Sequence, residues 1–407
     1  MKLKFLFIVI VLGVYCCNNT KKYQTTSVSV SENGNVMYTV SINSLTDVRK
    51  IIPISNLVED CRLVQLENIE DALVYPSSTT ITEKYIGVWQ TRNGGGTFKL
   101  FDRSGKFLCT LGSDESGTGE YSFSVYCDCI IDDENELIYL AEWITDRIYV
   151  FHSTGKLMKE FIFPKKLHSP VMFLSGDTLT VVRVALNNPF PKNYWYQADK
   201  VMIDKFNVNT GELLEELPPP AHLIINGDKN DGAIFTSRNL PETFDVQLHY
   251  YFTKSSYRDT LYHIDMKNNK IIPFFTVTYN ELDITPIEQQ PLKPFFYYLN
   301  ENVLMAYING KGLVATDLKS RTSSWVLIVN DYYGNIPVPT WPSNFRNGYF
   351  VQNLKPEELK KIIETQLAER RCTENDIQVL KKMLSNLQEG ANNVVFIGKL
   401  KSETELW

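Results

Sequence analysis

Long apolar runs, clustered basic charge and helical periodicity are all scarce in this 407-residue sequence. Only the first 17 residues approach the run of about 18 apolar residues that a membrane-spanning helix needs. Lys and Arg number 41 against 47 Asp and Glu, which excludes the clustered basic surface of a nucleic-acid binder. Between residues 60 and 350 short strand-like runs replace helical patterns, and aromatic residues reach 12% of the chain. The sequence therefore predicts an all-β fold and no nucleic-acid partner.

Motifs of common hydrolases and metal sites are also missing. There is no Gly-x-Ser-x-Gly elbow and no His-Glu-x-x-His, and the five histidines are scattered. Gly112–Thr118 resembles a phosphate loop only superficially, because it has no lysine and its acidic residues would repel phosphate. Asp132–Asn135 lacks the ligand spacing and the glycine of a calcium loop. The sequence predicts no catalytic residue, no metal and no cofactor, and leaves open a site formed by distant residues that converge in the fold.

The cysteines indicate neither a zinc site nor a disulfide framework. Two of the seven lie in the N-terminal segment, and the other five are Cys61, Cys109, Cys127, Cys129 and Cys372. An odd number leaves at least one of them unpaired within the chain. Cys127 and Cys129 share one face of a strand-like run with no histidine nearby, so buried strand cysteines explain them better than a zinc site does.

The N-terminal segment has the features of a secretory signal. Lys2 and Lys4 supply its positive charge, and Phe5 to Val14 form an apolar run of ten residues. The run ends at Val14-Tyr15-Cys16-Cys17, which resembles the cleavage site of bacterial lipoprotein signals. Residues 1–17 are therefore predicted to be a lipoprotein signal peptide. A plain cleaved signal or a membrane anchor is the alternative.

Cys17 is the predicted lipidation site. Its modification places aliphatic Val14 at position −3 and small Cys16 at position −1. Modification of Cys16 would instead place bulky Tyr15 at −1. No acidic residue follows Cys17 directly, which favours an outer-membrane lipoprotein of the cell envelope on the periplasmic side over one on the cell surface.

Residues 18–45 are predicted to form a tether with a hairpin at its end. The stretch up to Ser31 is rich in Ser and Thr, a composition that suits a solvated linker between lipid and domain. Asn33-Gly34 then separates two strand-like runs, residues 27–30 and 36–40, as in a two-residue hairpin turn. The folded domain is expected to occupy residues 46–407.

One strand–turn–strand unit recurs along the chain. In its clearest copy Thr97–Asp102 is followed by the turn Arg103-Ser104-Gly105 and a second strand from Lys106. Turn markers of the five copies are separated by 50, 56, 58 and 52 residues: Gly105, Gly155, Gly211, Asn269 and Arg321. About 50 residues per unit is typical of a four-stranded propeller blade, and residues 60–400 hold roughly six such units. A stack of unrelated hairpins is the alternative.

The two ends of the domain are predicted to close the ring. Cys61–Leu66 alternates apolar and polar residues near the start, and Val394–Leu400 forms the last strand. Pairing of these segments would complete a sixth blade and remove two free sheet edges. The sequence therefore predicts a six-bladed β-propeller closed by its N- and C-terminal strands.

Residues 356–389 are predicted to form a helical insertion in the last blade. Pro356 opens one amphipathic stretch, and Thr373 caps a second with Asp376 three residues later. Gly390 ends the second stretch. Two helices packed on the propeller are predicted, and a helix pair that binds a partner is the alternative.

Several of these segments resemble one family. Asp47–Ile52, Cys61–Glu67 and Leu100–Phe107 are similar to the six-bladed β-propeller lipoproteins of gut-type Gram-negative anaerobes, as is the helix pair before a last strand. The Gly-Pro-Gly-Glu-Tyr loop of that family corresponds to Gly117–Tyr121, with Thr in place of Pro. The resemblance covers the chain from about residue 40 and implies the fold. It implies little about function, because the motifs are structural turns and the family is largely without assigned activity.

The loops between the second and third strands of the blades are the best candidate binding surface, since they are expected to gather on one rim. They span residues 92–96, 143–147, 185–200, 253–259 and 309–312. Cationic and aromatic side chains outnumber acidic ones there, although the chain has a net charge of −6. Such side chains could stack on sugars or peptide side chains and bind carboxylates. The candidate ligand-binding residues are Arg92, Trp143, Arg147, Tyr194, Trp195, Lys254 and Arg258.

A solvated rim with internally packed aromatics is the alternative to that surface. For the whole protein, the sequence predicts a non-catalytic, lipid-anchored propeller that binds a glycan, a peptide or a protein partner. One alternative is a propeller hydrolase or lyase acting on a glycan or lactone. Convergence of three or more carboxylate, His or Asn side chains at the central channel would favour it. Another is a structural subunit of an envelope complex that docks through the helix pair.

Overall fold

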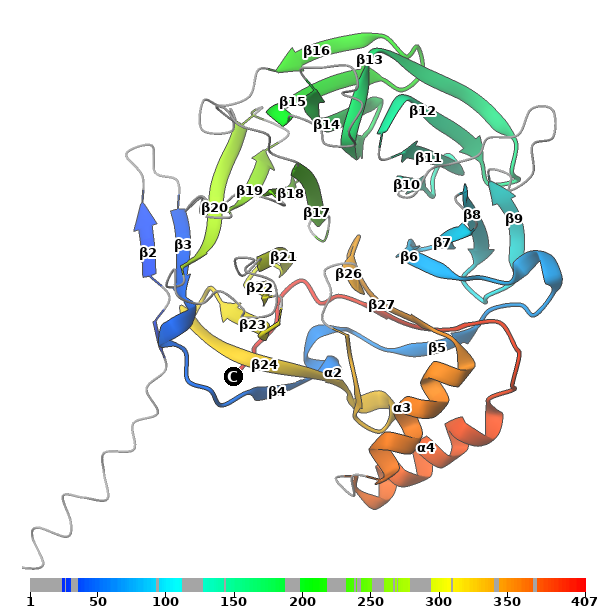
Figure 1. Ribbon diagram of the computed structural model, residues 1–407, viewed down its shortest axis with the longest axis vertical. Helices are drawn as coiled ribbons and strands as arrows, with labels where there is room; N and C mark the ends of the chain where they lie inside the picture. Colours follow the sequence, from blue (N-terminus) through cyan, green and yellow to red (C-terminus); the bar gives the residue numbers. More distant parts are fainter. Residues whose placement is uncertain are drawn as a thin grey trace, which may run out of the picture.

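The computed structural model describes residues 24–25, 27–30, 36–92, 95–111, 127–142, 144–186, 198–217, 232–237, 239, 243–250, 260–265, 268, 270–278, 294–308, 310–339, 344–368 and 372–407. Their strands stand around a common centre as the blades of a six-bladed propeller (Figure 1). The predicted fold class is confirmed, including the closing strands and the helix pair in the last blade.

Each blade is built on four antiparallel strands, with the first strand nearest the centre (Figure 1). Blade one consists of β6 (Pro76–Ile81), β7 (Tyr85–Arg92), β8 (Gly95–Asp102) and β9 (Phe107–Leu111). Blade two consists of β10 (Cys127–Asp132), β11 (Leu137–Glu142), β12 (Ile144–His152) and the first half of β13 (Leu157–Ser175). Blade three begins with the second half of β13 and continues with β14 (Thr178–Leu186), β15 (Ala198–Asn207) and β16 (Leu213–Leu217).

The other three blades complete the ring. Blade four consists of β17 (Gly232–Ser237), β18 (Thr243–Tyr250), β19 (Thr260–Asp265) and β20 (Lys270–Thr278). Blade five consists of β21 (Pro294–Asn300), β22 (Val303–Ile308), β23 (Gly312–Asp317) and β24 (Thr322–Asn330), with β25 (Ile336–Pro337) on its edge. Blade six consists of β26 (Phe345–Arg346), β27 (Tyr349–Leu354), β28 (Val394–Lys399) and, from the start of the domain, β5 (Arg62–Gln65).

The pairing of β5 with β28 closes the ring, as the sequence predicts. The two strands are antiparallel, with Gln65 opposite Val394 and Arg62 opposite Ile397. Beyond the last pair, the N–H of Leu66 donates to the carbonyl of Asn393 at 3.0 Å. The outermost strand of the last blade is therefore supplied by a segment more than 300 residues away in sequence.

The N-terminal chain also covers the outer edges of the two preceding blades. β3 (Val36–Ser41) forms a hairpin with β2 (Ser27–Val30) and runs parallel to β20. β4 (Lys50–Pro53) runs parallel to β24, which the short β1 (Gln24–Thr25) also contacts. The chain thus passes outside blade four and then blade five before it enters blade six as β5 (Figure 1). Short helical turns along this path and in later connections are η1 (Ile42–Ser44), α2 (Ile54–Leu57), η2 (Glu70–Ala72) and η4 (Asp331–Tyr333).

The turns between third and fourth strands repeat one hydrogen-bonding pattern. The side-chain oxygen of the Asp or Asn that ends the third strand accepts a hydrogen bond from a backbone N–H of the turn. This bond fixes the reversal of the chain. The donor–acceptor distances are 2.8 Å for Ser104 to Asp102, 2.8 Å for Asn209 to Asn207, 3.0 Å for Asn268 to Asp265 and 2.9 Å for Lys319 to Asp317. The recurring units seen in the sequence are therefore equivalent turns of successive blades.

Three of the turn glycines also seat each blade on its predecessor. Gly105, Gly155 and Gly211 have backbone φ angles of 90°, 91° and 74°, which residues other than glycine rarely adopt. A Cβ atom on Gly105 would lie 2.3 Å from the carbonyl oxygen of Gln65, on the outer strand of blade six. Equivalent Cβ atoms on Gly155 and Gly211 would contact Cys109 and Phe161, on the outer strands of blades one and two. Close packing between neighbouring blades therefore depends on these positions.

Apolar side chains fill the gaps between adjacent blades. Strand residues point alternately to the two faces of a sheet, so each blade contributes one face to each of its neighbours. Six buried clusters result within the described residues, one in each gap between blades. The largest lies between blades five and six and includes side chains of α3 (Pro356–Ala368) and α4 (Glu374–Asn386), the helices that connect β27 to β28. No described helix is both long and apolar enough to cross a membrane.

We predict that Gly105→Ala destabilises the protein by about 3 kcal/mol, because the positive φ costs about 1 kcal/mol and the contact with Gln65 adds the rest. Gly176→Ala is the matched control, since Gly176 has φ of 54° and no atom within 4 Å of a Cβ there. Urea and thermal unfolding measure both variants. Equal losses in the two would contradict the close approach of blade one to β5.

Candidate functional site

The topology places all five predicted rim loops between the second and third strands of their blades. They connect β7 to β8, β11 to β12, β14 to β15, β18 to β19 and β22 to β23. Strand direction alternates within a blade, so these connections all leave the blades in the same direction. In blade six the corresponding connection is the helix pair, α3 and α4.

Of the seven candidate rim side chains, the structure describes Arg147. Its Nη1 donates to Glu160 Oε2 at 2.8 Å, across the third and fourth strands of blade two, and 34% of the arginine side chain is exposed. Trp143, Tyr194, Trp195, Lys254 and Arg258 lie outside the described residues, and so do the side chain of Arg92 and the lipidation site Cys17. Whether these side chains come together stays a prediction.

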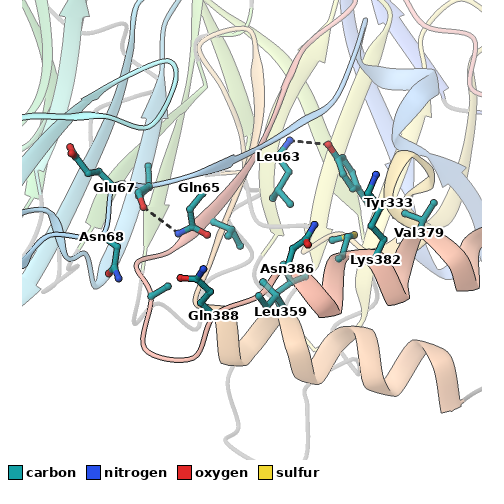
Figure 2. A pocket seen from close by; sticks show the side chains of 15 residues that line it. Leu63, Gln65, Glu67, Asn68, Tyr333, Leu359, Val379, Lys382, Asn386 and Gln388 are labelled. Carbon is teal, nitrogen blue, oxygen red and sulfur yellow. Dashed lines mark hydrogen bonds between the residues drawn. The ribbon is translucent and has the colours of Figure 1, made fainter.

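A groove of about 600 Å³ lies between the helix pair and β5 (Figure 2). One wall is β5 with the residues that follow it, and the other is α4 with the segment that leads to β28. Tyr333 of η4 lies at one end and Glu67 and Asn68 at the other (Figure 2). The groove therefore runs along the outermost strand of the closing blade.

The floor of this groove is apolar and its rim is polar. Apolar side chains come from both walls and from α3: Leu63, Leu66, Leu359, Val379, Met383, Leu387, Ala391 and Val394. The rim consists mostly of uncharged amides, with one cation and one anion: Gln65, Asn68, Asn386, Gln388, Lys382 and Glu67. The Glu67 carboxylate accepts a hydrogen bond from the N–H of Phe107 at 2.8 Å. An apolar floor with a few convergent polar groups is the usual composition of a ligand site.

The periodicity of α4 explains why it has two useful faces. Leu380 and Met383 are buried in the cluster between blades five and six. Val379, Met383 and Asn386 recur at helical spacing and line the groove. Figure 2 shows Val379 and Asn386 on the side of α4 that faces β5. The sequence predicts an apolar stripe of Ile377, Leu380, Leu384 and Leu387, of which Leu380 is fully buried. It missed Met383 and the positions that face the groove, because the strand opposite them is distant in sequence.

Backbone groups of β5 contribute to the groove. Leu63 N–H points away from β28 and donates to the hydroxyl of Tyr333 at 2.9 Å (Figure 2). Burial raises the pKa of Tyr333, as do the nearby Cys61 and Asp60, so this hydroxyl stays neutral at physiological pH. Gln65 Nε2 donates to the carbonyl of Asn392 at 2.7 Å, which joins β5 to the segment after α4.

The N-terminal cap of α4 fixes the position of the groove wall. Thr373 and Asp376 form the capping box that the sequence predicts, with Asp376 Oδ2 accepting from the N–H of Thr373 at 2.9 Å. Gly334 approaches this helix closely, since a Cβ there would lie 2.6 Å from Leu380. Burial acts to raise the pKa of Asp376, but hydrogen bonds from Thr373 and Asn335 outweigh it and lower that pKa.

Polar side chains also converge at the centre of the ring, where they bind one another. Asp128 on β10 forms an ion pair with Arg346 on β26. The same carboxylate accepts a hydrogen bond from the N–H of Met172 on β13 at 2.7 Å. Asn239 donates to the carbonyl of Phe345 at 3.0 Å. These groups join the inner strands of blades two, three and six, and their partners are other parts of the ring.

A smaller cavity of about 400 Å³ lies where the first two strands of several blades turn. Lys399 and Glu83 form an ion pair of 2.8 Å at its edge, and hydrogen bonds from Lys399 and Tyr349 lower the pKa of Glu83. Thr82 donates to Asp133 at 2.6 Å. In the part of the chain that the structure describes, no three His, Cys, Asp or Glu side chains gather to hold a metal ion.

The chain belongs to DUF4934, a family described as a domain of unknown function, which it matches over residues 37–399. No curated protein matches it. This family and the fold together define a class of six-bladed propellers of unknown function. The sequence resemblance to six-bladed propellers without assigned activity is confirmed to that extent.

Two solved structures from Bacteroides are similar to this chain. A protein of Bacteroides fragilis NCTC 9343 that is thought to be exported has a TM-score of 0.51 and 12% identity, over 89% of this chain and 98% of its own. A DUF4221 member of Bacteroides vulgatus ATCC 8482 has a TM-score of 0.40 and 14% identity, over 85% of this chain and 98% of its own. At 12% identity, the likeness to the first structure concerns the fold alone.

We predict that Thr373→Ala costs about 1 kcal/mol in the local stability of α4, because it removes one half of the capping box. Amide hydrogen exchange along α4 measures the loss.

The lowered pKa of Asp376 means that its carboxylate stabilises the folded helix above an unfolded pKa of about 4. This contribution is lost as the pH falls further, through the lowered folded pKa. In wild-type protein, hydrogen exchange along α4 should therefore report a less stable helix as the pH falls. Asp376→Asn should abolish this pH dependence, and a variant that retained the wild-type pH dependence would contradict the role of Asp376.

Proposed function

We propose that this protein is a non-catalytic binding module of the cell envelope that takes its ligand or partner in the groove between α4 and β5. The groove carries the proposal. Its volume of about 600 Å³ lies within the range of roughly 300–1,000 Å³ common among ligand sites. Its floor is apolar and its rim is mostly uncharged amides. The carboxylate of Glu67 accepts from the N–H of Phe107, and the hydroxyl of Tyr333 accepts from the N–H of Leu63.

The geometry gives less support to an enzyme. The sequence hypothesis of a hydrolase or lyase asked for converging carboxylate, His or Asn side chains at the central channel. Such groups do converge there, but Asp128 and Asn239 bind Arg346 and backbone groups of neighbouring blades. A carboxylate held between three blades is a structural link, and moving it to serve a substrate would break its ion pair with a buried arginine.

The cationic and aromatic rim is a second proposed surface of the same module. Its loops correspond in topology to the helix pair, which forms one wall of the groove. This surface is the less supported of the two.

A photoreactive amino acid at position 386 tests the groove. Asn386 lines it, whereas its neighbour Ser385 is exposed on the same helix outside the groove and is the matched control. Irradiation of intact cells should yield about tenfold more cross-linked product from position 386 than from position 385, because only the former faces a bound molecule. Mass spectrometry measures both. Equal yields would contradict the groove as the binding site.

The envelope location rests on the proposed lipid at Cys17. Cys17→Ala should abolish incorporation of a radiolabelled fatty acid and release the protein into the soluble fraction, since the acyl chains would supply the membrane affinity. Cys16→Ala should leave both unchanged. Persistent label in Cys17→Ala would transfer the site to Cys16, and an absence of label in every form would indicate a plain signal peptide or an uncleaved anchor.

A further inference from the structure

We infer that the occupant of the groove is an extended peptide segment of a partner protein, which adds to the outer edge of β5 as a further strand. The inference rests on the proposed function and names the chemistry of its ligand. It follows from three observations: how this chain covers its other outer edges, which backbone groups β5 presents, and what lies beneath them.

The outer strands of blades four and five already carry an added strand. β3 runs along β20 with Tyr38 opposite Phe275, and β4 runs along β24 with Ile52 opposite Ile328. Both additions extend the sheet through main-chain hydrogen bonds, as in recognition by strand addition. In blade six the outer strand is β5, and its free side faces the groove. The molecule therefore shows twice, on neighbouring blades, the mode of binding that the groove leaves room for.

The register of β5 decides which of its backbone groups point outward. In an antiparallel pair, alternate residues direct both N–H and C=O toward the partner strand. Leu66 N–H points inward to Asn393, and Leu63 N–H points outward to Tyr333. Leu63 and Gln65 are therefore the outward-facing residues. Gly105 lies against the Gln65 carbonyl and Tyr333 against the Leu63 N–H, so the Leu63 carbonyl and the Gln65 N–H lie between them.

One acceptor and one donor at this spacing match the main chain of an added strand. A peptide residue placed there would give its N–H to the Leu63 carbonyl and accept from the Gln65 N–H. Tyr333 and Gly105 bound the edge, so the paired part of the ligand is short. The side chains beside that residue would then be the main source of affinity.

The floor of the groove suits those side chains. Met383 on α4, Leu387 just after it and Leu359 on α3 lie across from β5 and form an apolar surface. A strand points alternate side chains to opposite sides, so we expect apolar residues at alternate positions of the ligand, facing this surface. The other positions would face the polar rim, where Lys382 favours an acidic residue beside α4 and Glu67 a basic residue at its own end of the groove.

A display library of random ten-residue peptides, presented to the full-length protein in detergent micelles, tests the inference. Recovered peptides should alternate apolar with polar residues. Asn386→Trp, which fills the groove, should lower the affinity of these peptides about tenfold or more. Ser385→Trp should leave their affinity within about twofold of the value for the unchanged protein. Hydrogen exchange should slow at the Gln65 amide when such a peptide binds.

Backbone N-methylation separates strand addition from binding by side chains alone. Each recovered peptide is synthesised with a methyl group on one amide nitrogen at a time. One methylation should cost about tenfold in affinity, because it removes the hydrogen bond to the Leu63 carbonyl, and those at the adjacent positions should cost far less. If affinity is the same whichever single amide carries the methyl group, the inference is overturned.

Other outcomes separate this inference from the proposed function. A library that yields no peptide sensitive to Asn386→Trp overturns the inference. If dodecanoic acid then binds and Asn386→Trp abolishes its binding, the groove takes an acyl chain and the proposed function stands. If sedimentation shows a dimer that Asn386→Trp dissociates, the occupant is a second copy of this chain. Equal cross-linking from positions 385 and 386, as described above, would remove the proposed function itself.

Discussion

The pairing of β5 with β28 is the interaction on which the rest of the structure depends. Each apolar cluster lies between two blades and needs side chains from both, so the ring is complete only when the last blade packs on the first. Val64 and Leu66 contribute to the cluster between blades six and one, while Leu63 packs against the cluster between blades five and six. A single short strand therefore completes two cores. Loss of that strand would expose apolar surface on both sides of blade six and leave β28 as a free edge.

Hydrogen bonds from asparagine side chains reinforce the closure. Asn392 Oδ1 accepts from the N–H of Val74 at 3.1 Å, and its Nδ2 donates to the carbonyls of Glu67 and Ala72, both at 2.8 Å. Asn353 donates to Thr79 at 3.0 Å, which links blade six to blade one. Buried amides of this kind stabilise only when all their groups are satisfied. They add polar requirements to a register that the apolar packing of β5 on its two faces also favours.

The same closure creates the groove. β5 is held on one side by β28 and leaves its other side open, and the helix pair inserted between β27 and β28 lies opposite that open side. An occupant that binds both β5 and α4 would therefore stabilise the closed ring, by linkage between binding and folding. The residues before β5 protect the outer edges of blades four and five, so the chain itself has already covered the edges that would otherwise invite association.

Much of this architecture was readable in the sequence because it depends on local chemistry. Gly105, Gly155 and Gly211 mark turns that need positive φ, Thr373 and Asp376 mark a helix start, and alternation marks Cys61–Leu66 as a strand. The number of blades, the closing pair and the helical insertion follow from such signals. The tertiary structure alone decided that β3 and β4 add to outer strands in parallel, because main-chain hydrogen bonds at an edge carry no side-chain pattern. It alone also brought Leu63 and Gln65 opposite Asn386, since a groove between segments 300 residues apart exists only once the ring has closed.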